Sequence, residues 1–267
     1  MKLSCTNAMI PGNGLTEKAE KLRQWGYDGI AVFVEYSEWN EALHQEILSL
    51  YKNTGITPCE FAFSDKIYGH LMDDDLTLRS QSRKMYQLAA KVSGEIKAVT
   101  ELEFAYGAQD PLPLFDPYAK MSVEQEQAFL EMYREVAAPL VHSGGRMLLE
   151  GINRYESPYL NSIKACKDII DRLALTNTGV LADFFHMSIE EADIVESIRY
   201  AGESIKHVHL GDNNRLLPGY GSIDWNRCFA ALKEVGYEGF VNLECSTCGD
   251  PAQTLPAVAE FLKPLME

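Results

Sequence analysis

Positive charge is scarce in this sequence, and long apolar runs are missing from it. The 39 aspartates and glutamates outnumber the 24 lysines and arginines, so the formal net charge is −15 at pH 7. A surface of that sign repels phosphate backbones, and no segment rich in lysine or arginine offsets it, so we expect no nucleic acid partner. Because there is no stretch of about 18 apolar residues, we also expect no membrane-spanning segment.

Cysteines are few and irregularly spaced. Six of them in 267 residues do not form the pattern of a disulfide-stabilised fold. The first residues, MKLSCTNAMIPGNG, lack the apolar core of a secretory signal. We therefore expect a cytoplasmic protein with reduced thiols. Cys245 and Cys248 form a CxxC pair, but zinc would require a second pair of ligands and none is evident, so we expect neither a zinc site nor a redox site there.

A glycine-rich dinucleotide-binding turn is absent as well, whereas short apolar runs recur along the whole chain. Near-continuous runs of this kind are typical of strands buried on both faces of a parallel sheet. There are eight of them, at residues 2–7, 29–35, 56–63, 96–104, 146–152, 179–185, 205–211 and 240–246. Because stretches with helical periodicity separate them, we predict an α/β fold, a (β/α)8 TIM barrel that forms a single domain over residues 1–267.

Capping signals predict where several helices begin. Four pairs of residues have the required spacing or composition: Ser122 with Gln125, Ser157 with Pro158, Ser188 with Glu191, and Asp250 with Gln253. The longest irregular stretch, residues 105–121, follows the fourth predicted strand. A loop of that length in a compact domain is more often functional than not, so we expect it to act as a lid.

Polar side chains interrupt the last four apolar runs near their carboxyl ends, where barrels of this kind carry their chemistry. They are Glu150, Asp183, His209 and Glu244. An unpaired charge in such surroundings costs on the order of several kcal/mol. One divalent cation bound by all four would remove that cost, and a separate local partner for each residue is the alternative. Three carboxylates and one imidazole suit Mn²⁺, with Co²⁺ or Mg²⁺ as further options.

Other polar residues lie close to these four in the sequence. His207 and His209 share one face of their strand, because side chains alternate with a period of two. His209 is nearer the strand end and is expected to reach the cation, while His207 is expected to hydrogen bond behind it. Glu156, His186 and Arg215 follow the predicted ligands by a few residues and could contact a substrate. For Arg215 a surface salt bridge is the alternative, and for His186 a position at a helix start.

The segments around these residues resemble the xylose-isomerase-like barrel superfamily, and within it the D-tagatose/D-psicose (allulose) 3-epimerases. They are LLEGINRYE, LADFFHMSIEE, HVHLGDNNRLLPGYG and NLECST, spread over residues 148–247. The resemblance implies one metal ion and named roles: metal ligands Glu150, Asp183, His209 and Glu244, catalytic Glu150 and Glu244, and substrate contacts from Glu156, His186 and Arg215. It also implies a homodimer or homotetramer. The loop after the fourth strand and the segment GDNNR differ from those of the sugar epimerases.

This resemblance implies a divalent-metal-dependent ketose 3-epimerase or sugar isomerase. We expect Glu150 and Glu244 to face the substrate from opposite sides, so that one removes a proton beside the carbonyl and the other returns one to an enediolate. The alternative enzyme is a metal-dependent lyase or isomerase on another oxygen-rich carbonyl compound, such as a keto-inositol, hydroxypyruvate or a 3-keto-glycoside. A non-catalytic sugar-binding barrel is a third class, although its site would be expected to have lost ligands.

Overall fold

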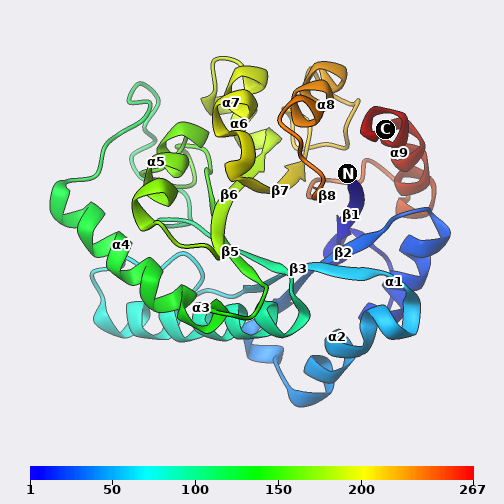
Figure 1. Ribbon diagram of the computed structural model, residues 1–267, viewed down its shortest axis with the longest axis horizontal. Helices are drawn as coiled ribbons and strands as arrows, with labels where there is room; N and C mark the ends of the chain where they lie inside the picture. The colour runs from blue at the N-terminus through cyan, green and yellow to red at the C-terminus, as the bar shows by residue number, and fades with distance from the viewer.

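The computed structural model describes residues 1–267, and its eight strands form one closed parallel barrel with helices around it (Figure 1). The strands are β1 Lys2–Thr6, β2 Gly29–Glu35, β3 Thr57–Ser64, β4 Val99–Leu102, β5 Arg146–Glu150, β6 Thr178–Asp183, β7 Ile205–Leu210 and β8 Phe240–Leu243. Neighbouring strands pair in chain order, and β8 pairs with β1 to close the barrel. The predicted (β/α)8 fold is therefore confirmed.

Helices connect the strands and cover the outside of the barrel. They are α1 Leu15–Gln24, α2 Glu41–Thr54, α3 Leu76–Ile96, α4 Val123–Ala137, α5 Ile163–Leu173, α6 Phe184–Glu190, α7 Ile194–Ala201, α8 Trp225–Glu234 and α9 Pro251–Met266. Four short 3-10 helices complete the set, at Asn7–Met9, Tyr36–Glu38, Ala138–Leu140 and Gly202–Ser204. No helix combines the length and the apolar character that crossing a membrane requires.

Burial explains why the strands are apolar along almost their whole length. All six residues of β6 are buried, because the barrel interior packs on one face of each strand and the helices pack on the other. The helices are apolar on one side only. In α5 the buried residues are Ile163, Cys166, Ile169, Ile170 and Leu173, which form one stripe at helical spacing. The stripe packs against the barrel and leaves the other side of α5 in solvent.

Two of the predicted helix starts are confirmed. The Ser122 hydroxyl accepts a hydrogen bond from the backbone of Gln125, whose side chain accepts one from the Ser122 backbone, so the capping box at α4 is complete. Asp250 caps α9 by accepting from the backbone of Ala252. In both cases the polar side chain satisfies an N–H group that has no partner within the helix.

The other two predicted starts are wrong. The helix expected at Ser157 begins later, at Ile163, and Ser162 is its cap. Ser188 lies inside α6, because Asp183 already caps that helix. The next helix, α7, begins after Asp193 rather than at the predicted pair. Local spacing could not reveal that a residue assigned to the metal site is also a helix cap.

Most strands are shorter than the predicted runs, and the two largest differences are at β4 and β8, the second of which affects the site. Helix α3 extends to Ile96, so β4 covers only Val99–Leu102 of the predicted 96–104. Strand β8 ends at Leu243, so Glu244 lies just beyond the strand. Its side chain is 24% exposed, which makes it the most accessible of the four predicted ligands.

The long connection between β4 and α4 contains the predicted lid. It is joined to the loop after β5 by two backbone hydrogen bonds, from Gly107 N to Glu156 O at 2.9 Å and from Gln109 N to Tyr155 O at 3.0 Å. Tyr106 of this connection lines the cavity described below. The connection therefore forms part of the entrance to the barrel, and a closing motion remains a prediction.

Candidate active site

Side chains from the last four strands converge at one end of the barrel. Glu150 ends β5, Asp183 ends β6, His209 lies one residue before the end of β7, and Glu244 follows β8. One possible ligand atom from each of the four lies within 4.8 Å of the others. Residues distant in sequence meet here because all strands of the barrel are parallel and end at the same face.

The arrangement of these four side chains fits a divalent cation. His209 Nδ1 lies 3.2 Å from Glu244 Oε2, 3.7 Å from Glu150 Oε1 and 3.9 Å from Asp183 Oδ2. This nitrogen is fully buried and makes no hydrogen bond. A buried nitrogen without a partner, facing three carboxylates, is an arrangement that a shared cation would satisfy. The donor set of three oxygens and one nitrogen matches Mn²⁺, Co²⁺ or Mg²⁺.

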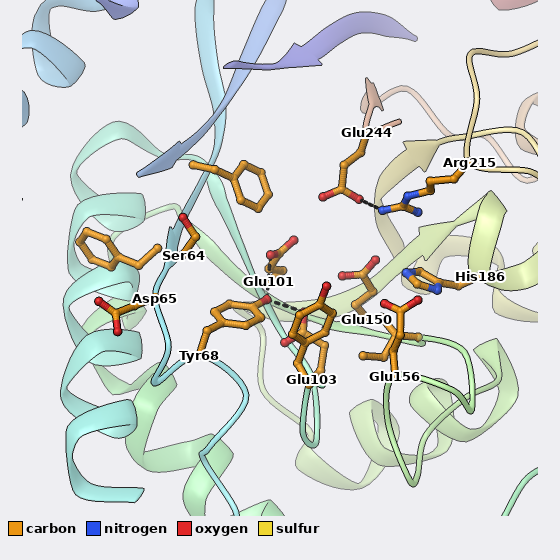
Figure 2. Close-up of a pocket in the computed structure, with 14 residues that line it drawn as sticks. Ser64, Asp65, Tyr68, Glu101, Glu103, Glu150, Glu156, His186, Arg215 and Glu244 are labelled. Atoms are coloured by element: carbon orange, nitrogen blue, oxygen red, sulfur yellow. Dashed lines mark hydrogen bonds and ion pairs between the residues drawn. The ribbon is translucent and has the colours of Figure 1, made fainter. Parts of the chain in front are cut away.

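Arg215 lies over the site and is not the surface salt bridge that its sequence position allowed. Its guanidinium donates to Glu244 Oε2 at 2.6 Å (Figure 2). It also donates to Asp183 Oδ2 at 2.7 Å. It also stacks on Phe185, with Cζ 4.6 Å from the ring centroid. Arg215 therefore supplies positive charge to two of the predicted ligands.

Glu150 and Glu244 have environments that shift their proton affinities in opposite directions. Burial raises the pKa of Glu150 well above its ordinary value, although His209 nearby opposes the shift. Burial would also raise the pKa of Glu244, but His209 and Arg215 together hold it well below its ordinary value. A pair of carboxyl groups with separated pKa values can divide the roles of acid and base.

The predicted substrate residues His186 and Glu156 are joined by Asn153. The backbone N–H of Asn153 donates to His186 Nδ1 at 3.2 Å, and its side-chain amide donates to Glu156 Oε1 at 2.8 Å. Because Nδ1 accepts, the proton of the neutral ring lies on Nε2. Burial lowers the pKa of His186, so the ring is a neutral donor. Asn153 was not identified from the sequence, where an asparagine after a strand carries no distinctive signal.

A cavity of about 260 Å³ adjoins the candidate metal site. Figure 2 shows the side chains that line it. Five of the predicted site residues line it, namely Glu150, Glu156, His186, Arg215 and Glu244. Asp183 and His209 do not line it; both are fully buried. The structure thus brings all seven predicted residues to one place, with two of them below the cavity floor.

The cavity wall next to Glu150 holds two further glutamates, Glu101 and Glu103, which sequence reasoning missed. The Tyr68 hydroxyl is 2.8 Å from Glu101 Oε1 and 2.5 Å from Glu103 Oε1 (Figure 2). One hydroxyl donates only one proton, so one of the two glutamates must itself carry a proton. Burial raises the pKa of Glu103 to about 7 and that of Glu101 well above its ordinary value. Their alternate positions in TELEF, which place both on one strand face, were the available signal.

Glu60 was missed as well, and it lies behind the predicted histidine ligand. It is fully buried on β3, and its carboxylate oxygens are 3.0 and 3.2 Å from His209 Nε2. His207 Nε2 is 3.2 Å from the same carboxylate, in the deeper position predicted for that histidine. Burial opposes protonation of His209, but Glu60 and Glu244 raise its pKa well above the ordinary value in the metal-free protein.

Several sugar epimerases are similar to this chain in sequence. Two D-psicose 3-epimerases are 38% identical to it: that of Enterocloster bolteae over 96 residues and that of Ruminiclostridium cellulolyticum over 115 residues. These matches cover 36% and 43% of this chain but only 32% and 39% of the two relatives. A 3-dehydro-D-guloside 4-epimerase of Escherichia coli is 25% identical over 261 residues, which cover 95% of both chains.

Solved structures with the same fold extend over the full chain. A 3-keto-D-glucoside 4-epimerase from E. coli superposes with a TM-score of 0.84 at 24% identity, covering 99% of both chains. A D-psicose 3-epimerase from Clostridium cellulolyticum, solved with D-tagatose, superposes with a TM-score of 0.83 at 22% identity, covering 100% of both. At these identities the likeness establishes the fold.

The family follows from a match that covers most of the sequence. The profile of xylose isomerase-like TIM barrels matches residues 19–265, a range that includes seven of the eight strands and all four residues of the candidate metal site. The closed parallel barrel agrees with that description. This chain belongs to the xylose isomerase-like TIM barrel family.

Proposed function

We propose that this protein is a divalent-metal-dependent epimerase that moves a proton at a carbon next to the carbonyl of a ketose or keto-sugar. The observation that carries the proposal is the convergence of Glu150, Asp183, His209 and Glu244 below a cavity. The sugar epimerases among the relatives support it. Mn²⁺ is the proposed cation, with Co²⁺ or Mg²⁺ as alternatives.

Glu150 and Glu244 are proposed to transfer the protons. When bound, the cation would polarise the substrate carbonyl and stabilise the negative charge that develops on its oxygen. One glutamate removes the proton and the other returns one to the opposite face of the carbon. Two groups are needed, because a single base would return the proton to the side from which it came. The opposed pKa shifts of the two carboxyl groups are consistent with this division.

Three side chains are proposed to hold the substrate. His186 Nε2–H and the Arg215 guanidinium are donors for oxygen atoms, and Glu156 accepts from a hydroxyl. Six of the fourteen cavity-lining residues are aspartate or glutamate, whereas Arg215 is the single lysine or arginine among them. A phosphate or carboxylate on the substrate would meet this excess of negative charge, so we propose an uncharged polyhydroxy carbonyl compound.

A 3-keto-glycoside is the second candidate substrate. It is favoured by one observation, the match over 95% of both chains to a 3-dehydro-D-guloside 4-epimerase. The two D-psicose 3-epimerases described above are more similar in sequence, but they match over a shorter segment that includes less than half of their length. Free ketoses and 3-keto-glycosides should therefore be tested side by side, because the proton-transfer chemistry is the same for both.

The test is proton exchange with solvent. The metal-free protein is loaded with Mn²⁺, incubated in D₂O with D-fructose, D-psicose, D-tagatose or a 3-keto-glucoside, and filtered free of protein and metal for NMR. We expect deuterium at a carbon adjacent to the carbonyl of one of these sugars, together with its epimer. The chelator-treated protein should show neither exchange nor epimer. The Glu244→Gln variant should form no epimer, because the one remaining base would return deuterium to the side from which it removed the proton. The absence of exchange on every sugar would contradict the proposed function.

The remaining proposals concern the setting of the enzyme. We propose a homodimer or homotetramer, as the family resemblance implies. We also propose that the protein is cytoplasmic, because its six cysteines are free. Size-exclusion chromatography with light scattering measures the oligomeric state directly, and a monomer at micromolar concentration would contradict it.

A further inference from the structure

Glu60 lies inside the barrel, opposite the strand that carries the histidine of the candidate metal site. It belongs to β3 and His209 to β7, two strands that are not neighbours in the sheet. Their side chains meet across the interior, where both residues are fully buried. A charged carboxylate at such a depth is costly unless it accepts hydrogen bonds from a specific partner. Its position therefore points to a defined role.

The two nitrogens of His209 face different surroundings. Nε2 is 3.0 and 3.2 Å from the two Glu60 oxygens, and Nδ1 faces the three carboxylates of the candidate metal site without forming a hydrogen bond. In the neutral ring, which is the form that can bind a cation, Nε2 must carry the proton, because an ionised carboxylate can only accept a hydrogen bond. The neutral ring then presents the lone pair of Nδ1 to the place where a cation would bind.

His207 lies beside the same carboxylate, but its Nε2 makes no hydrogen bond. Its Nε2 lies 3.2 Å from Glu60 Oε2, and its ring packs edge-on against that of His209 with centroids 5.3 Å apart. Glu60 is therefore located between two histidines of one strand face. His207 reaches only the carboxylate, whereas His209 extends from the carboxylate to the candidate metal site.

We propose that Glu60 is a positioning residue that selects the Nδ1-coordinating form of His209, and so determines how tightly and with what geometry the protein binds its divalent cation. The inference rests on the metal site of the proposed function and extends it to a residue that makes no direct contact with the cation. Carboxylates that accept from the distal nitrogen of a histidine ligand typically contribute a factor of about 10 to 100 in metal affinity.

The first experiment measures cation binding to the metal-free protein without substrate. Isothermal titration with Mn²⁺ compares wild type, Glu60→Gln and the matched variant His207→Gln, which alters the other neighbour of the same carboxylate. We expect affinity to fall by roughly 10-fold or more in Glu60→Gln and by less than about 3-fold in His207→Gln. The visible spectrum of the Co²⁺ forms should change in Glu60→Gln, which a purely structural role would not produce. Equal affinities and spectra for wild type and Glu60→Gln would overturn the proposal.

A second measurement uses the wild-type protein and so does not depend on whether a variant folds. Long-range ¹⁵N NMR of the Mg²⁺-loaded protein should find the His209 proton on Nε2, and a proton on Nδ1 would overturn the proposal. The two hypotheses can also fail separately. A protein that binds Mn²⁺ but exchanges no substrate proton would contradict the proposed function alone. If the protein is an active epimerase but Glu60→Gln binds the cation as tightly as wild type, only this inference would be contradicted.

Discussion

Replacing Arg215 by methionine tests the electrostatics of the site in the absence of the cation. The change removes a guanidinium that donates to Asp183 at 2.7 Å and to Glu244 at 2.6 Å. Hydrogen bonds to charged groups contribute roughly 1.5–3 kcal/mol each. Two effects reduce this energy. One third of the Arg215 side chain is exposed, so solvent screens the two hydrogen bonds. The variant also avoids the desolvation cost of a partly buried guanidinium. We expect a net loss of about 2–3 kcal/mol of unfolding free energy in chelator.

The expected loss depends on the cation, and this dependence is the test. For a chain of this size it corresponds to a melting temperature lower by roughly 4–10 °C in chelator. With Mn²⁺ bound, the cation itself neutralises Asp183 and Glu244, so the loss should fall to less than about half. Thermal unfolding followed by circular dichroism, in EDTA and in Mn²⁺, measures both values.

The matched control is Arg154→Met. Arg154 donates to both oxygens of Glu190, at 3.0 and 2.8 Å, and neither residue belongs to the candidate metal site or lines the cavity. The loss of unfolding free energy in Arg154→Met should therefore be the same with and without Mn²⁺. If Arg215→Met behaved in the same way as this control, the cation would not be bound by Asp183 and Glu244 and the reasoning would be refuted.

Three further predictions follow from single contacts. The pKa of Glu103 is about 7 in the folded protein, against an ordinary 4.5. Protonated Glu103 therefore adds roughly 3 kcal/mol to the unfolding free energy below pH 4.5, and this stabilisation is lost as the pH rises through 7. In the Glu103→Gln variant of the metal-free protein, the unfolding free energy should fall less between pH 5 and 8 than in wild type. Urea unfolding at several pH values measures this, and the same fall with pH in both proteins would count against the prediction. Tyr133→Phe removes hydrogen bonds to Met147 O at 2.7 Å and to Thr178 Oγ1 at 2.5 Å; it should lower the unfolding free energy by about 1–2 kcal/mol, whereas wild-type stability would show that the hydroxyl does not contribute. Glu244→Gln should keep its fold but lose roughly 10³-fold or more in turnover, and a near-wild-type rate in a coupled assay would exclude Glu244 from proton transfer.

The fold and the candidate metal site could be predicted because both leave local patterns in the sequence. Each strand is an apolar run, and each of the four predicted ligands interrupts such a run near its end. Parallel closure then brings the four together without any further information. The same logic failed at Ser188, where the true cap was Asp183, because local spacing does not show which of two polar side chains accepts from the helix backbone.

The missed residues depend on contacts between distant segments. Glu60 lies 149 residues from His209 in sequence, and their contact exists only once β3 and β7 face each other across the closed barrel. Glu101 and Glu103 acquire their partner from Tyr68, which belongs to the connection after β3. Nothing in the spacing of a single strand indicates such pairs, so they became visible only in three dimensions.

The backbone bonds that join residues 107 and 109 to residues 155 and 156 have a consequence for how substrate preference could diverge. One rim segment supplies Tyr106 and the other supplies Glu156, so main-chain pairing holds these two parts of the cavity rim together. Point substitutions on this rim would change which sugars are admitted while leaving the reacting groups at the strand ends in place. New specificities could therefore arise here by small steps, without a stage at which proton transfer is lost.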